Sequence, residues 1–509
     1  MGTVDRRALG FDRRGLLPWL VAGLLAAGAA DAADLTIAVT WTGDVGMFGD
    51  GLCSLREAIE SANDLVQEDS CGPGEHGDPL PVVGDDRITI DVPAGIYELE
   101  LAGADEDLNV TGDLDLHRIV TLQGAGLGVT VIDGMQLDRV LELHGLFSFS
   151  DRAVIRDLSL RGGRPPAEQD GGCLRSLNSQ LLLDRVEVAE CETPDPGVGG
   201  LFGGSGGGLA IEGGAVEIRR SEIVDNTTFK ASGGGIWVVD ATVDVVRTTI
   251  ARNLATIPNG TVSGGGLANL SGTVNVHASA VLDNEVTGQG GGLFNFTFGE
   301  KTLNVMNTTV ARNRATGSGG GIRSYGDLSL THVTITENVA DSDGEGNGQG
   351  GGVRLGGQSN TVIKGSIVAW NEDHSPPPST TIFPDISGTV TSAGFNIVLD
   401  GAGLVGIVDG VLGDSVGVDP LLDLPTGTPE YFPLLPASTA IDQIPRLACV
   451  AVSYGANTLW SAGTGVQLDQ RGVGRGTLCE IGAFEDRTPE IFEDDWEAGD
   501  LSAWSLAVP

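Results

Sequence analysis

A triple glycine followed by an apolar residue recurs through the middle of the chain, and it constrains the fold more than any other feature. The copies start at Gly206, Gly233, Gly264, Gly290, Gly319 and Gly350, with a weaker copy, DGGC, at Asp170. Each continues with short alternating stretches and closes on a motif ending in Asn. A repeat of about 30 residues with several strands and no helical period predicts one coil of a parallel β-solenoid per copy.

The alternation within one copy, TVDVVRTTIARN, shows which side chains we expect to face inward. Val243, Val245 and Ile250 are predicted to enter the core, while Asp244 and Arg247 point outward. Successive coils of such a solenoid stack at roughly 4.7–4.9 Å.

The closing motifs align one Asn per coil. Their amides can hydrogen-bond along the stack, so we predict a structural asparagine ladder and no catalytic role for these residues. Its members are Asn226, Asn253, Asn284, Asn313, Asn338 and Asn371. In the weaker copy, Cys191 takes the ladder position and Cys173 follows the glycines.

The six cysteines form three near pairs: Cys53 with Cys71, Cys173 with Cys191 and Cys449 with Cys479. An even count in an exported chain indicates disulfides, and of the fifteen connectivities we favour these neighbours. The sequence has no CxxC pair, so a zinc site is not expected.

Residues 1–32 are typical of a signal peptide, because four arginines precede an apolar run and Ala30 and Ala32 offer a cleavage site. A retained N-terminal anchor is the alternative. The net charge of −40 argues against nucleic acid or anionic lipid as a partner. We expect a secreted or cell-surface protein without a membrane span in the mature chain.

One stretch, CSLREAIESAND (53–64), predicts a helix in this strand-rich chain. Ser54 and Glu57 form an S-x-x-E capping box. An apolar face of Leu55, Ala58, Ile59 and Ala62 is suited to cover the open N-terminal end of the solenoid.

Both ends of the chain resemble a known family. CSLREAI followed by AND is similar to the signature of the bacterial CSLREA-domain proteins, in a match over Cys53, Ser54, Leu55, Arg56, Glu57, Ala58, Ile59, Ala62 and Asn63. VDPLL (418–422), LLPASTAID (434–442) and LDQRGVGRGTLCEIGAFE (468–485) resemble the choice-of-anchor Q domain, with Glu480 where that pattern usually has Asp. The resemblance implies an exported right-handed parallel β-helix and no particular reaction.

These features predict an all-β, pectate-lyase-like solenoid with an N-terminal capping helix. We expect a signal peptide (1–32), an N-terminal cap (33–85), coils (86–375), last coils with a C-terminal cap (376–486) and an acidic tail (487–509). The tail resembles a short C-terminal element of exported bacterial proteins, and a plain acidic end is the alternative.

Two candidate binding sites follow from the repeats. Outward residues near the glycine runs could stack on sugar rings, namely Trp237, Phe294, Arg323 and Tyr325. The simpler interpretation is that they shield glycine-rich strands. DSDGEGNGQG places Asp341, Asp343, Glu345 and Asn347 at alternate positions, as a Ca²⁺ loop would, although a solvated acidic turn is the favoured interpretation. We predict no other cofactor.

The leading hypothesis is a non-catalytic protein that binds an extracellular glycan or a cell-surface component. The outward column Ala210, Trp237, Ala268, Phe294, Arg323 and Arg354 contains no acid, so we predict no catalytic residues there. A polysaccharide lyase or glycoside hydrolase is the alternative, and at least three carboxylates with an Arg in one groove would favour it. The six histidines are scattered along the sequence, and we expect them not to cluster.

Overall fold

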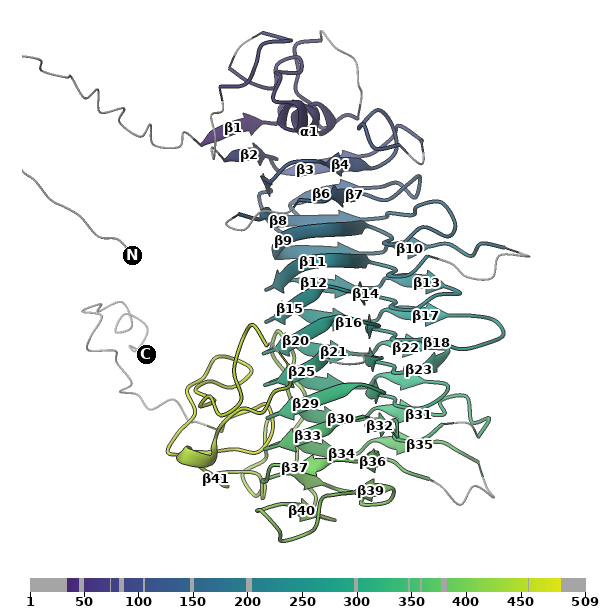
Figure 1. Cartoon of the computed structure of the whole chain (residues 1–509), viewed down its shortest axis with the longest axis vertical. Helices are drawn as coiled ribbons and strands as arrows, with labels where there is room; N and C mark the ends of the chain where they lie inside the picture. Colours follow the sequence, from purple (N-terminus) through teal and green to yellow (C-terminus); the bar gives the residue numbers. More distant parts are fainter. Residues whose placement is uncertain are drawn as a thin grey trace, which may run out of the picture.

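The computed structural model is an elongated right-handed parallel β-helix with one α-helix at its N-terminal end (Figure 1). It describes residues 34–44, 50–73, 75–81, 87–103, 106–146, 151–197, 204–296, 301–346, 348–357, 359–376, 382–455 and 457–486. The predicted signal peptide, the acidic tail and Asn347 lie outside these residues. The predicted fold class is confirmed.

Three long faces and one short sheet run along the solenoid, and every pairing within them is parallel. Face A contains β4 (Leu114–Leu116), β7 (Leu141–His144), the starts of β9 (Leu174–Ala189) and β11 (Leu209–Arg219), β14 (Ile236–Val239), β19 (Leu267–Asn269), β24 (Leu293–Asn295), β28 (Ile322–Ser324), β32 (Val353–Leu355), β36 (Ile386–Thr389) and β39 (Leu404–Val405).

Face B contains β1 (Leu35–Ala38), β2 (Ile88–Asp91), β5 (Val120–Gln123), the start of β8 (Ala153–Arg161), later parts of β9 and β11, β15 (Thr242–Val246), β20 (Thr273–His277), β25 (Thr302–Met306), β29 (Asp327–Thr331), β33 (Thr361–Lys364) and β37 (Thr391–Ser392).

Face C contains β3 (Gly95–Glu98), β6 (Thr130–Asp133), the ends of β8 and β9, β12 (Glu222–Val224), β16 (Thr249–Ala251), β21 (Ala280–Leu282), β26 (Thr309–Ala311), β30 (Thr334–Thr336), β34 (Ile367–Ala369), β38 (Ile397–Val398) and β40 (Ser415–Val416). The short sheet contains β10 (Glu192–Thr193), β13 (Thr227–Phe229), β17 (Leu254–Thr256), β22 (Glu285–Val286), β27 (Arg314–Ala315), β31 (Val339–Ala340) and β35 (Glu372–Asp373). β18 (Val262–Ser263) pairs with β23 (Gly288–Gln289).

Stacked apolar side chains fill the interior, and the residues after the glycine runs form one of their columns. Leu209, Ile236, Leu267, Leu293, Ile322 and Val353 are all fully buried and lie in register. The glycines are required because neighbouring coils approach closely: a Cβ on Gly234 would lie 2.4 Å from the carbonyl oxygen of Gly265.

The six asparagines form the predicted column at the turn after face C. Each side-chain Nδ2 donates to the Oδ1 of the next Asn over 2.9–3.0 Å. The column begins at the backbone N–H of Cys191, which donates to Asn226, and ends where Asn371 donates to Asp385. Every coil from 191 to 385 is therefore tied to the next inside the core.

The N-terminal helix α1 (Leu55–Asp64) has the predicted capping box. The backbone N–H of Glu57 donates to Ser54 Oγ over 3.2 Å, and the N–H of Ser54 donates to Glu57 Oε2 over 2.9 Å. The apolar helix face is at most 3% exposed and contacts the first coils at β2 and β4. The helix therefore covers the N-terminal end of the core (Figure 1).

The structure contains all three favoured disulfides, Cys53–Cys71, Cys173–Cys191 and Cys449–Cys479. Among the described residues, no helix is long and apolar enough to cross a membrane.

The C-terminal segment, residues 417–486, packs along one side of the solenoid (Figure 1, yellow). It contains the antiparallel pair β41 (Ile444–Pro445) and β42 (Leu478–Cys479) and a short 3₁₀ helix (Arg446–Ala448). Its contacts run from Asp244, which accepts from Thr458, to Gly365, whose carbonyl accepts from Gly482 N–H. The segment expected to cap the solenoid thus builds a second wall beside faces B and C.

Candidate anion-binding site

Three successive coils carry an arginine at the same turn between faces B and C. Arg185, Arg220 and Arg247 all have a left-handed backbone, with φ between 50° and 55°. The strands before the turns are in register, because Asp184 pairs with Arg219 and Arg219 pairs with Val246. The three side chains therefore leave the solenoid one coil apart, at about 4.8 Å spacing.

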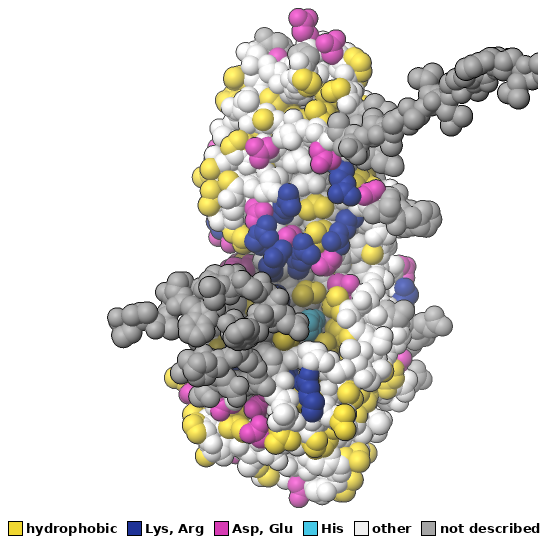
Figure 2. Space-filling view, turned by 90° about the vertical axis from the view of Figure 1, so that its left-hand side faces the viewer, with side chains coloured by type: hydrophobic (Ala, Val, Ile, Leu, Met, Phe, Trp, Pro, Cys, Tyr) yellow, Lys and Arg dark blue, Asp and Glu magenta, His cyan; other side chains and the backbone are white. Residues whose placement is uncertain are grey.

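Arg156 and Arg219 lie beside this column, and together the five arginines form what we call the arginine patch: Arg156, Arg185, Arg219, Arg220 and Arg247. Figure 2 shows Lys and Arg side chains gathered in the middle of the molecule, on the side that faces the viewer. Three carboxylates, Asp157, Asp184 and Glu217, pair with members of the patch, and Glu217 also pairs with Arg152 outside it. Five guanidinium groups against these three leave at least two positive charges on a chain whose net charge is −40.

The Asp184 carboxylate binds three arginines of the patch and holds them together. It is 3% exposed and accepts both Arg220 Nε over 2.9 Å and Arg220 Nη2 over 2.6 Å. Arg185 and Arg219 each reach the same carboxylate over 3.2 Å. A hydrogen bond from Arg185 lowers the pKa of Asp157, so that carboxyl stays ionised at neutral pH. The guanidinium groups are held in place while their outer edges face solvent.

Arg247 differs from the other members of the patch. It is exposed, and within the described residues its guanidinium has no hydrogen bond or ion pair. Gly472 of the C-terminal segment has no side chain and so leaves room for the Arg247 guanidinium. A Cβ added to Gly472 would lie only 3.1 Å from Arg247 Nη2. An exposed guanidinium without a carboxylate partner is well placed to bind an anion.

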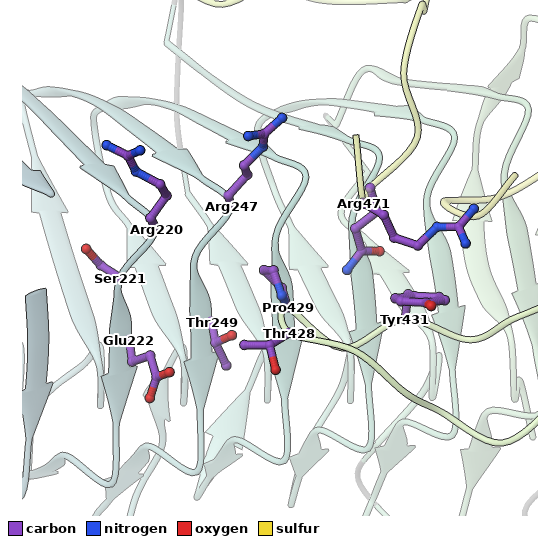
Figure 3. A pocket seen from close by; sticks show the side chains of 10 residues that line it. Arg220, Ser221, Glu222, Arg247, Thr249, Thr428, Pro429, Tyr431 and Arg471 are labelled. Carbon is purple, nitrogen blue, oxygen red and sulfur yellow. The ribbon is translucent and has the colours of Figure 1, made fainter. Parts of the chain in front are cut away.

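A cavity of about 300 Å³ lies between the arginine patch and the C-terminal segment (Figure 3). The solenoid contributes Arg220, Ser221, Glu222, Arg247 and Thr249, and the C-terminal segment contributes Thr428, Pro429, Tyr431, Gln470 and Arg471. Figure 3 shows Arg220 and Arg247 extending side by side from successive coils, with Tyr431 and Arg471 on the opposite wall. We call this cavity the arginine pocket.

The far wall of the arginine pocket is held rigidly. The Tyr431 ring stacks on Phe484 with centroids 5.4 Å apart, and Arg471 lies over Phe484 at 4.1 Å. Arg471 also donates to Asp469 over 2.7 Å, so its charge is already paired. Gln470 accepts a hydrogen bond from Thr309 of the solenoid over 2.7 Å. The arrangement offers the unpaired guanidinium of Arg247, the paired guanidinium of Arg220 beside it, one aromatic face and the hydroxyls of Thr249 and Thr428 around one small space.

Behind this wall, Arg475 and Glu485 form a fully buried ion pair at 3.1 Å. Burial and the neighbouring Glu485 raise the pKa of Glu480 to about 9. The folded protein therefore holds a proton on Glu480 that the unfolded chain releases above its ordinary pKa near 4.5. This contribution to stability is present at low pH and is lost as pH rises toward 9.

We expect Glu480→Gln to raise the melting temperature relative to the wild-type protein at pH 8, because the amide keeps the protonated shape without ionising. Melting curves between pH 6 and 9 should fall with pH in the wild-type protein and fall less in the variant. Exposed Glu372 gives the control, since Glu372→Gln should leave the slope unchanged. Parallel wild-type and Glu480→Gln curves would contradict this role.

Three of the four predicted sugar-stacking residues come together on face A. Phe294 and Tyr325 lie 6.1 Å apart, and Arg323 sits over the Tyr325 ring at 3.9 Å. Phe294 and Arg323 are only 6% exposed, and Arg323 and Tyr325 both donate to Gln289. Trp237 is half-buried two coils away, as the register predicts. This packing agrees with the simpler interpretation, that the side chains shield the strands, and sugar binding here stays a prediction.

The predicted calcium turn is only partly described. Asp341 is buried, and its carboxylate accepts the backbone N–H of Gly346 over 2.8 Å. Asp343 and Glu345 are exposed, and Asn347 lies outside the described residues. In the described parts of the chain, Asp341, Asp343 and Glu345 do not converge as metal ligands would. Calcium binding here stays a prediction.

The expectation that the histidines do not cluster is wrong for two of them. The rings of His117 and His144 stack with centroids 4.7 Å apart, and His144 Nε2 lies 2.9 Å from Asp115. His332 is also buried against the Cys449 sulfur at 3.7 Å. His117 and His144 lie in the irregular first coils, where no repeat reveals which residues share a position.

Carboxylates also gather in these first coils, two and three coils before the outward column that lacks them. Arg139 pairs with Asp113 over 2.8 Å and also with Glu142, while Glu142 is 3.4 Å from Arg175. The side chains of Arg139, Asp113 and Glu142 are at most 8% exposed. With Glu212, which is 2.9 Å from Arg175, three carboxylates lie beside these arginines. The ion pairs of Arg139 are packed into the protein, those of Arg175 are partly exposed, and none of these residues lines the arginine pocket.

The sequence contains a signal for the arginine patch in addition to the glycine and asparagine repeats. Three successive copies read LLLDR, VEIRR and VDVVR just before the same turn, ending at Arg185, Arg220 and Arg247. Aligning the copies on their Asn motifs would have placed the three arginines in one column. The opposite wall, from Thr428 to Arg471, has no such signal because it belongs to no repeat.

Comparisons with known proteins find similar solved structures. The match to the pectate lyase Pel9A covers 90% of this chain and 98% of the Pel9A chain, with 12% identity and a TM-score of 0.39. The A-modules of the Azotobacter vinelandii mannuronan C-5 epimerases AlgE4 and AlgE6 each cover 74% of this chain, and 96% and 98% of their own, with 18% and 17% identity and TM-scores of 0.33 and 0.34. No family model and no curated protein matches the chain.

Proposed function

We propose that this protein is an exported, non-catalytic β-helix protein that binds an acidic extracellular glycan at the arginine pocket. The observation that carries the proposal is Arg247, an exposed guanidinium without a carboxylate partner among the described residues, one coil from Arg220 in the same cavity. Membership of the CSLREA-domain family and a signal peptide remain part of the proposal. Three disulfides support an oxidising compartment.

The chemistry of the pocket suits a sugar that carries a carboxylate. A guanidinium binds a carboxylate through two parallel hydrogen bonds, and such charge-assisted bonds are among the stronger polar contacts. The Tyr431 ring offers an apolar face for a pyranose ring. Thr249 and Glu222 provide a donor and acceptors for hydroxyls. A neutral glycan would leave the Arg247 guanidinium without a partner.

The column Arg185, Arg220 and Arg247 extends the site beyond one sugar. One positive group leaves each coil at about 4.8 Å spacing, and this regular spacing suits a linear polyanion whose charges also repeat along a chain. The net charge of −40 repels such a ligand at long range. At physiological ionic strength this repulsion is screened within roughly 8 Å, so the local positive patch decides contact binding.

Replacing Arg247 with Ala is expected to weaken binding of an oligogalacturonate or an oligomannuronate at least about tenfold, because a charged hydrogen-bonding group is worth roughly 1.5–3 kcal/mol. Isothermal titration calorimetry on the mature chain measures the change. Arg252→Ala is the matched control, since Arg252 is exposed but paired with Asp225 at 2.7 Å on another turn. A neutral cello-oligosaccharide should not bind.

Equal affinity in the wild-type protein and Arg247→Ala would contradict the proposed site. Loss of binding in Tyr325→Ala instead would move the site to the aromatic group on face A. Comparable binding of single-stranded DNA would show that the patch recognises charge alone, which contradicts a glycan site.

A polysaccharide lyase or glycoside hydrolase is the second candidate function, favoured by Asp113, Asp115 and Glu142 lying close to Arg139 and Arg175. Incubation with acidic polysaccharides, with detection of unsaturated products and of new reducing ends, separates the two functions. The binding proposal predicts that neither forms. Product formation that disappears in Glu142→Gln would establish the enzyme instead.

A further inference from the structure

Ligand atoms of Asp107, Asp115 and His144 converge in the first coils, where Asp115 lies in β4 and His144 in β7 of face A. One oxygen or nitrogen from each of the three side chains lies within 4.8 Å of the other two. His144 Nε2 and Asp115 Oδ1 are 2.9 Å apart. Two ligand atoms bound to one Zn²⁺ at about 2.0–2.2 Å lie roughly 3 Å apart, so this pair already has the separation that a shared ion requires.

A second, independent observation at Asp115 points to a bound ligand. The residue is 1% exposed, and its second oxygen, Oδ2, is buried without a hydrogen-bond partner in the described structure. A buried carboxylate oxygen normally accepts hydrogen bonds or binds a cation, because removing it from water is costly. A cation bound between Asp115 and His144 would give one of the two carboxylate oxygens, Oδ2 or Oδ1, a positively charged partner.

The surrounding residues hold the strand that carries Asp115 in place. Asn109 accepts the Asp115 N–H over 2.7 Å and donates to its carbonyl over 2.9 Å. Asn63, near the end of α1, donates to the same carbonyl over 2.7 Å and accepts the His117 N–H over 2.9 Å. The N-terminal helix therefore positions both Asp115 and His117.

His117 links the other two members of the group. Its ring stacks on His144, and its Nε2 lies 2.7 Å from the backbone carbonyl of Asp107. The ring thus fixes the plane of the imidazole and the position of the exposed loop at the same time. His117 is a positioning residue here. Asp107 and Asp115 come from one coil, before and within β4, and His144 comes from β7 of the next coil.

We propose that Asp107, Asp115 and His144 bind one divalent transition-metal ion of the Zn²⁺ class. An imidazole with two carboxylates suits such an ion, whereas Ca²⁺ takes six to eight oxygen ligands. Three protein ligands leave at least one position for water. Glu142, whose Oε1 is 3.8 Å from His144 Nε2, is already paired with Arg139 and Arg175 and remains an outer neighbour.

This site is separate from the predicted calcium turn and from the cysteines. The sequence argued against zinc only through the missing CxxC pair, and a site built from Asp107, Asp115 and His144 does not depend on cysteine. The spacing of 8 and 29 residues between its members follows no short metal-binding motif, so folding alone brings them together.

The test is calorimetric titration of the tag-free, chelator-treated mature chain with ZnCl₂ at pH 7.5, together with melting curves with and without the ion. We expect one Zn²⁺ per chain and a higher melting temperature in its presence. His144→Gln and Asp107→Asn should each weaken binding at least about tenfold and remove most of the melting shift. CaCl₂ at the same concentration should produce neither effect.

His374→Gln is the matched control, because His374 forms an exposed pair with Glu372 outside this group, and its zinc affinity should equal that of the wild-type protein. Melting curves without metal show whether each variant is folded. If His144→Gln does not fold, the zinc affinity of Asp107→Asn tests the site, because Asp107 is exposed and its replacement should not affect folding. Absence of zinc binding, or unchanged affinity in both ligand variants, would overturn the site. Tighter binding of Ca²⁺ than of Zn²⁺ would overturn the class of ion.

Discussion

Replacing Arg56 with Met is expected to lower the free energy of unfolding by about 3–5 kcal/mol, because it leaves a buried carboxylate without its partner. Arg56 is 2% exposed and binds Asp44 through Nε over 2.7 Å and Nη2 over 3.1 Å. It also donates to the carbonyls of Gly112 and Asp113 over 2.8 and 3.0 Å. One guanidinium thus joins the helix to the loop before β4 and to the chain after β1.

Urea unfolding followed by circular dichroism measures this loss. Arg252→Met removes an exposed pair with Asp225 and should cost at most about 1 kcal/mol. A cost below 1 kcal/mol for Arg56→Met would show that the helix is not needed to hold the first coils. Because Arg56 belongs to the CSLREA stretch, a large cost would give that motif a structural explanation.

Replacing Asn313 with Ala, in the middle of the asparagine ladder, is expected to lower the free energy of unfolding by at least about 3 kcal/mol. Its Nδ2 donates to Asn338 Oδ1 and to the Val281 carbonyl, both over 2.9 Å. Its Oδ1 accepts from the backbone N–H and from Nδ2 of Asn284. Each buried polar group left unpaired costs roughly 1–3 kcal/mol, and several are left at once.

Asn360→Ala is the control for the ladder, because Asn360 is exposed and donates only to Asp327 in the described structure. Its variant should unfold within about 0.5 kcal/mol of the wild-type protein. Similar stability of Asn313→Ala and Asn360→Ala would mean that apolar packing, and not the amide column, holds the coils together.

The solenoid was predictable because the same packing and hydrogen-bonding pattern recurs in successive coils. One inward column, from Leu209 to Val353, and one amide column, from Asn226 to Asn371, recur once per coil, so each copy supports the interpretation of the others. The capping box of Ser54 and Glu57 was predictable for a different reason, since it depends only on residues three apart.

The functional candidates were harder to predict because they join segments that do not repeat. The wall with Tyr431 meets Arg247 only because the C-terminal segment packs along the solenoid, and no sequence pattern indicates that direction. Likewise, Asp107, Asp115 and His144 meet across irregular first coils whose lengths differ. The aromatic residues Phe294 and Tyr325 were placed correctly by register, but their burial depends on neighbours that the register does not show.

The most direct test of the acidic-glycan site is a hydrogen-exchange footprint of an oligogalacturonate or oligomannuronate that binds the wild-type protein. We expect slower exchange in residues 219–222, 247–249 and 428–431, the segments that contribute most of the arginine pocket's lining, and no change around Phe294 and Tyr325. Protection confined to the aromatic group on face A, or binding without protection of residues 247–249, would contradict the acidic-glycan site.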